Sequence, residues 1–143
     1  MAKRMTKNTR KRREQFCFVL MPFDDKFRPI YNTIVRPAVE QASLRCVRSD
    51  EIFGTRPVME DIRENIQKAR ILLADLTGKN PNVLYELGLA HGSSKDVILM
   101  AQRIDDVPFD LRQYRLILYK DSVAGGPLLK KSISETIRSI LSS

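Results

Sequence analysis

The chain has 143 residues, of which 43% are hydrophobic and 29% charged, as expected of a globular domain with room for a real core. No apolar run approaches the roughly 18 residues of a membrane-spanning helix. The basic N-terminus has no apolar segment behind it, so we expect a cytoplasmic protein with no secretory signal and no membrane partner.

The net charge of +8 is concentrated at the N-terminus. Residues 1–13 carry seven of the 25 Lys and Arg residues and no acid, which leaves a nearly neutral body. We therefore predict a basic, disordered arm over residues 1–15 and a single domain over residues 16–143. Such an arm is usually solvated, and weak contact with nucleic acid is the alternative role.

Strand-length apolar runs occur five times along the domain. They predict strands covered on both faces at 16–23, 44–49, 71–76, 97–102 and 115–119. Cys17 and Cys46 lie inside the first two runs, without the further Cys or paired His residues that a metal site needs. We expect buried, reduced thiols on neighbouring strands, in a reducing compartment, and no metal site.

Helical spacing of apolar residues separates these runs. It predicts helices within 24–42, from Pro57 to Ala69, over 82–92 and at the C-terminal end, with a kink or an early break at Pro37. The stretch 103–114 has no clear helical period, and we predict irregular structure there.

This alternation indicates an α/β fold, with a doubly wound, flavodoxin-like parallel sheet and helices on both of its faces. Five strands in one small domain favour the strand order 2-1-3-4-5. In that order, ligands bind outside the carboxyl ends of the strands, where the order reverses between the first and third strands.

Acidic side chains follow the predicted strands at this edge. They are Asp24, Asp25, Asp50, Glu51 and Asp75, with Glu86 in the helix that follows. If Asn82 caps that helix, its positive end favours an ionised Glu86, which suits a nucleophile or a partner for a developing cation. Simple complementation of the helix dipole by an acid explains the same position equally well.

Four stretches carry a resemblance to a known family. "FVLMPF" followed by acids, "DEIFGTRPVMEDI", "ILLADLTGKNPNVLYELGLAHG" and "VILMAQ…VPFDLRQYRLILY" resemble the bacterial TIR-like members of the nucleoside 2-deoxyribosyltransferase superfamily, over residues 16–119. The resemblance implies cleavage of the N-glycosidic bond of a nucleoside, a nucleotide or an NAD-like dinucleotide. NAD would then be a substrate, with no cofactor required, and a homo-oligomer is expected.

The same resemblance assigns roles to individual residues. Glu86 matches the glutamate that attacks the anomeric carbon, and Asp61 matches the acid that helps to protonate the departing base. For substrate binding it points to the edge residues Pro22, Phe23, Asp24, Arg56, Asp75 and Asn82. Phe23 could stack on a base, Arg56 could clamp a phosphate, and Asp75 could hold sugar hydroxyls or bond the amides of its own turn. Asn82 stands near a sugar-binding acid of the transferases but is an amide here.

Two other readings share this topology. A phospho-receiver domain needs paired acids, a strand-end Asp and a Lys, which Asp24, Asp25, Asp75 and Lys120 match only superficially. A non-catalytic TIR-like module that senses nucleotides or binds proteins needs the same fold and does not need Glu86. Substitution of Glu86 separates the enzyme from that module.

Overall fold

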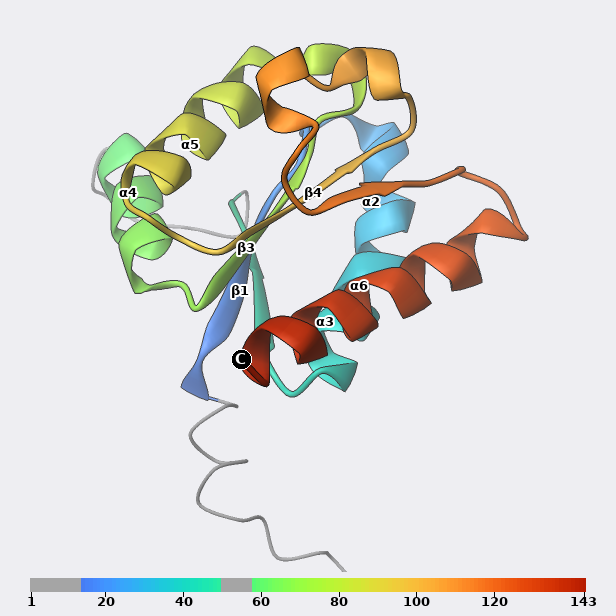
Figure 1. Ribbon diagram of the computed structural model, residues 1–143, viewed down its shortest axis with the longest axis horizontal. Coiled ribbons are helices and arrows are strands. Elements are labelled where there is room, and N and C mark those ends of the chain that lie inside the picture. The colour runs from blue at the N-terminus through green and yellow to red at the C-terminus, as the bar shows by residue number, and fades with distance from the viewer. Residues whose placement is uncertain (1–13, 50–57) are drawn as a thin grey trace, which may run out of the picture.

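The computed structural model describes residues 14–49 and 58–143. All five strands are parallel and form one sheet in the order β2-β1-β3-β4-β5, so the predicted fold class and strand order are confirmed (Figure 1). The strands are β1 (Phe16–Leu20), β2 (Arg45–Arg48), β3 (Ile71–Asp75), β4 (Val97–Ala101) and β5 (Leu116–Leu118). The predictions for residues 1–13 of the basic arm and for Asp50, Glu51 and Arg56 lie outside the described residues.

Helices cover both faces of the sheet (Figure 1). The helical segment after β1 packs with α6 (Gly125–Leu141) on one face, and α4 (Val58–Lys68) packs with α5 (Pro81–Gly92) on the other. Successive side chains of a strand point to opposite faces. In β1, Cys17 and Val19 therefore join the α6 side of the core, whereas Phe18 and Leu20 join the α5 side.

The segment after β1 is a helix with one widened turn. It comprises η1 (Asp25–Phe27), α2 (Arg28–Ile30), the π-helical turn η2 (Tyr31–Val35) and α3 (Arg36–Gln41). Within it, the Arg36 amide reaches back to the Tyr31 carbonyl. Pro37 has no N–H to continue an α-helical ladder, and the wide turn directly before it accommodates the ring. The predicted irregularity at Pro37 is thus a widened turn and not a break.

The connection between β4 and β5 contains no long helix. It holds two single turns, η5 (Ile104–Asp106) and η6 (Phe109–Leu111), which confirms the predicted irregular stretch. A third short turn, η4 (Thr77–Lys79), joins β3 to α5. None of the described helices has the length and apolar character needed to cross a membrane.

The two cysteines lie opposite each other in the sheet. Cys17 of β1 pairs in register with Cys46 of β2, and both are buried cysteines that form no disulfide. Burial, with a smaller contribution from Cys46, raises the pKa of the Cys17 thiol well above its ordinary value. The predicted burial of both thiols on neighbouring strands is confirmed, and a protonated, buried thiol is chemically inert.

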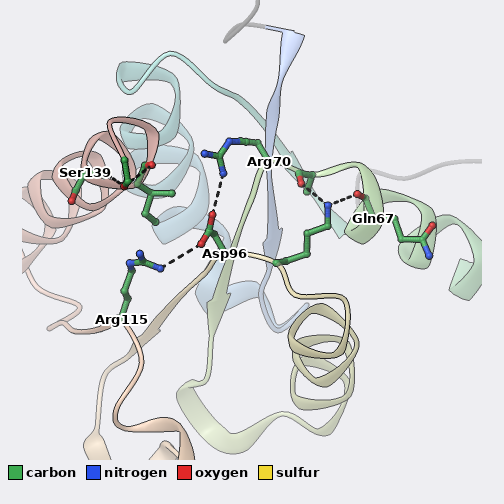
Figure 2. A network of polar contacts seen from close by, with 9 residues as sticks. Gln67, Arg70, Asp96, Arg115 and Ser139 are labelled. Atoms are coloured by element: carbon green, nitrogen blue, oxygen red, sulfur yellow. Dashed lines mark hydrogen bonds and ion pairs between the residues drawn. The ribbon is translucent and has the colours of Figure 1, made fainter.

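A polar network links the amino ends of β3, β4 and β5 (Figure 2). Asp96, just before β4, pairs with Arg70 at 3.1 Å and with Arg115 at 3.7 Å. The Lys95 ammonium donates to the carbonyl oxygens of Gln67 and Ala69 at the end of α4. These groups are partly exposed, so each ion pair contributes about 1 kcal/mol at most. The edge that carries the candidate site is the opposite one.

Candidate functional site

A small hollow lies at the carboxyl edge, where the strand order reverses between β1 and β3. It holds about 20 Å³ and is lined by Met21, Pro22, Phe23, Ser49, Asn80, Asn82, Val83 and Glu86. Four predicted site residues meet there, namely Pro22, Phe23, Asn82 and Glu86. In doubly wound sheets this reversal point is where ligands bind.

Helix α5 carries Glu86 to this hollow. Its cap is Asn80, whose side-chain oxygen accepts from the amides of Asn82 at 2.9 Å and Val83 at 3.2 Å. Pro81 then occupies the first helical position, where its missing N–H costs nothing. The expectation that Asn82 is the cap is therefore wrong by two residues. Glu86 consequently lies in the second turn, further from the positive helix end.

Burial dominates the electrostatics of Glu86. The residue is 6% exposed, and no described residue donates a hydrogen bond to its carboxylate or forms an ion pair with it. Burial raises the pKa of the Glu86 carboxyl from its ordinary value of 4.5 to about 7. The expected stabilisation of the ionised form by the helix dipole is therefore outweighed, because the dipole effect fades within the first turn.

This raised pKa makes Glu86 a source of pH-dependent instability. The folded protein holds the proton more tightly than the unfolded chain, so stability is full below pH 4.5 and is lost as the pH rises through about 7. We expect Glu86→Gln to be more stable than the wild type by about 2 kcal/mol at about pH 8, and equal to it near pH 4. Urea unfolding at both pH values measures this difference. Equal stability of the two proteins at the higher pH would contradict it.

Asp75 lies on the other face of the sheet from Glu86. It shares the α6 side with Leu73 and is 0% exposed. Its carboxylate accepts from the Tyr119 hydroxyl at 2.6 Å and from the Thr77 amide at 3.0 Å. The hydrogen bond from the Thr77 amide is the contact with its own turn that was one of the two roles predicted for Asp75. Its role in binding sugar hydroxyls stays a prediction.

Gln102 closes a ring of hydrogen bonds around Asp75 with two further contacts. The Gln102 side-chain amide donates to the Tyr119 hydroxyl at 3.2 Å, and the Gln102 backbone amide donates to the Thr77 hydroxyl at 3.1 Å. Burial is the largest cause of a raised pKa at Asp75, and the bonds from Thr77 and Tyr119 oppose it. The ring joins the ends of β3, β4 and β5 directly before the turn that leads to α5.

The remaining predicted residues stand apart from the hollow. Asp24 caps η1 by accepting from the Lys26 amide at 3.4 Å, and it is largely exposed. Asp61 is half-buried in the first turn of α4, where its backbone carbonyl accepts from Asn65. Neither lines the hollow, and their predicted roles remain untested. Among the described residues, no group of three or more His, Cys, Asp or Glu side chains is arranged to hold a metal ion.

Arg48 supports the wall of the hollow, and the sequence analysis did not identify it. It ends β2, is only 3% exposed, and donates to the Pro22 carbonyl at 2.8 Å. Its guanidinium also lies over the Tyr31 ring at 5.1 Å. Arg48 thereby holds one wall of the hollow in place. The only sequence signal was a second arginine, besides Arg45, in the four-residue strand β2.

No protein-family model and no curated protein matches this sequence. Solved structures do match. The TIR domain of the Toll-related receptor TRR-2 from Hydra magnipapillata aligns with a TM-score of 0.66 at 15% identity, over 85% of this chain and 97% of that one. A 2-deoxyribosyltransferase from Leishmania mexicana aligns with a TM-score of 0.53 at 16% identity, over 62% of this chain. This chain thus has the fold of TIR domains and deoxyribosyltransferases. It spans 65% of the Leishmania enzyme, less than two thirds of its length.

Proposed function

We propose that this TIR-like domain cleaves the N-glycosidic bond of a nucleoside, a nucleotide or an NAD-like dinucleotide, with Glu86 as the essential carboxylate. One observation carries the proposal. A buried carboxylate with no cationic partner among the described residues faces a hollow at the point where this fold binds ligands. Natural proteins retain such a destabilising group mainly at functional sites.

The chemistry suits a desolvated carboxylate. Breaking the bond between C1′ of the sugar and the base nitrogen builds positive charge on the sugar ring. The Glu86 carboxylate stabilises that charge, or traps it as a covalent glycosyl ester that water or a second base then resolves. A nicotinamide cation leaves as a neutral base, whereas other bases need a proton, for which Asp61 is the proposed donor.

Protonation of Glu86 then sets the pH dependence. Only the carboxylate form can attack or stabilise a cation, and burial raises the pKa of Glu86 to about 7. We therefore expect kcat/KM to rise with pH through about 7 and to level off above it. A profile that falls over the same range would instead make Glu86 the proton donor.

Substrate binding requires the hollow to widen, because 20 Å³ holds no more than one water molecule. Phe23 is 57% exposed at its rim, and an outward rotation of its ring would widen the hollow and let the ring stack on a base. Asn82, also exposed, would offer its amide to sugar hydroxyls.

The test is release of free base from a panel of NAD, NADP, nucleosides, deoxynucleosides and their monophosphates, followed by chromatography. The protein is used at high concentration, because a neighbouring subunit of a homo-oligomer could complete the site. The Glu86→Gln variant is run beside it. Release by the wild type alone identifies both the reaction and the substrate class.

The second candidate function is a non-catalytic module that senses nucleotides or binds other proteins. The small volume of the hollow favours it, because the hollow beside Glu86 has no preformed space for a nucleoside. No base release from the whole panel, by a folded and oligomeric protein, would select this function. Nucleotide binding would then be measured directly by calorimetry.

A further inference from the structure

A second and much larger cavity lies on the opposite face of the sheet from Glu86. It holds about 600 Å³, within the range typical of small-molecule sites. It opens between the end of β5 and the first half of α6. Its lining residues are Gln102, Leu118, Tyr119, Lys120, Ser122, Ala124, Gly125, Leu128, Leu129 and Ser132.

Two side chains of the Asp75 ring give this cavity polar groups. The Tyr119 hydroxyl is occupied, because it donates to Asp75 and accepts from the Gln102 side-chain amide. The side-chain oxygen of Gln102 accepts no hydrogen bond from any described residue. The Gln102 side-chain oxygen is therefore an acceptor that a ligand in the cavity can use. The hydrogen bonds of the Asp75 ring already hold this side chain in position.

The rim of the cavity is also preformed. The Gly125 amide donates to the Ser122 hydroxyl at 2.9 Å, and the Gly126 amide donates to the Ser122 carbonyl at 3.0 Å. A Cβ at Gly125 would lie 2.2 Å from the Lys120 carbonyl oxygen, so only glycine allows the chain to close this turn. Because this turn is already ordered, ligand binding would not require the entropy cost of ordering a loop.

The walls are apolar and open to solvent. Leu128 is 68% exposed and Leu118 is 52% exposed, whereas Leu129, which also lines the cavity, is buried. Two large apolar side chains on the rim of one hollow form a surface that gains free energy when an apolar molecule covers it.

Charge decides which molecule fits. Lys120 is the only charged residue that lines the cavity, and it forms no ion pair with any described residue. We propose that this cavity binds a small organic anion with an aromatic or otherwise flat apolar body. The apolar body lies between Leu118 and Leu128, and the anionic group pairs with Lys120. This site is separate from the Glu86 hollow and does not depend on its proposed function.

The experiment uses 2-naphthoate as the probe and the neutral 2-naphthalenemethanol as its uncharged comparison. Each is titrated into the ¹⁵N-labelled full chain, and amide chemical shifts are followed. We expect saturable shifts confined to Gln102, Leu118, Tyr119 and the first half of α6. Binding of the carboxylate should be tighter than that of the alcohol by up to about fivefold, since a partly exposed ion pair contributes about 1 kcal/mol at most.

Two pairs of variants make the test specific. Ala124→Phe fills the cavity and should weaken binding at least about tenfold, whereas Val123→Phe, at an exposed neighbour that does not line it, should leave binding unchanged. Lys120→Gln should remove the preference for the carboxylate, whereas Lys130→Gln should not. Non-saturable shifts, equal effects of both Phe variants, or shifts explained by a concentration-dependent dimer on this face would each overturn the proposal.

Discussion

Glu86→Gln is expected to reduce base release by about 10³-fold or more, because the amide can neither form a glycosyl ester nor neutralise the developing sugar cation. Gln has nearly the same shape, and the variant is expected to be at least as stable as the wild type above neutral pH. The loss should therefore appear in kcat with the fold intact. Chromatographic rates on the best substrate of the panel, together with circular dichroism, measure it.

Glu135→Gln is the matched control for this change. Glu135 is an exposed acid on α6 whose ion pair with Lys131 spans 3.9 Å, on the far side of the sheet from the hollow. This variant should keep the wild-type rate. If Glu86→Gln retained more than about a tenth of the activity, a difference of less than 1.4 kcal/mol in the barrier, Glu86 would not be the essential carboxylate.

Asp75→Ala is expected to destabilise the fold by about 3–4 kcal/mol. The change removes the acceptor of two donors, the Tyr119 hydroxyl and the Thr77 amide, and leaves a small cavity at a fully buried position. Each unsatisfied buried donor costs about 1–3 kcal/mol. Urea unfolding followed by circular dichroism measures the loss as a lower midpoint.

Two comparisons test this explanation. Asp105→Ala changes an exposed acid whose contact with Arg103 spans 3.5 Å, and it should cost less than about 0.5 kcal/mol. Asp75→Ala leaves the Tyr119 hydroxyl without its acceptor, and adding Tyr119→Phe removes that unsatisfied donor. The double variant should therefore be more stable than the sum of the two single effects predicts. Strict additivity would show that the hydrogen-bond ring is not the source of the loss.

The architecture could be predicted from the sequence because its signals are local. Five apolar runs of strand length, separated by helical patterns, are enough to indicate a doubly wound sheet. The same pattern placed Glu86, Phe23 and Asn82 at one edge, since parallel strands all end at the same side. Position along the chain was sufficient for this part of the site.

The cap of α5 shows how a local signal can still be misplaced. Asn80 and Asn82 are both good caps, and Pro81 between them is the better guide, because proline favours the first helical position. Choosing Asn82 put Glu86 in the first turn and predicted an ionised carboxylate. Because Asn80 is the cap, Glu86 lies in the second turn of α5, where the effect of burial on its pKa outweighs that of the helix dipole.

The sequence by itself determined the order of the elements, the sheet edge at which the acids collect and the presence of Glu86 on the helix after the third strand. Only the tertiary structure decided the burial and the neighbouring groups of each acidic side chain. It separated Asp75 from Glu86 by the thickness of the sheet, buried Glu86 without a cation among the described residues, and brought Arg48 against Pro22, 26 positions away. Burial, and hence the pKa and the cost of a charge, depends on groups packed from distant parts of the chain, and no local pattern records them.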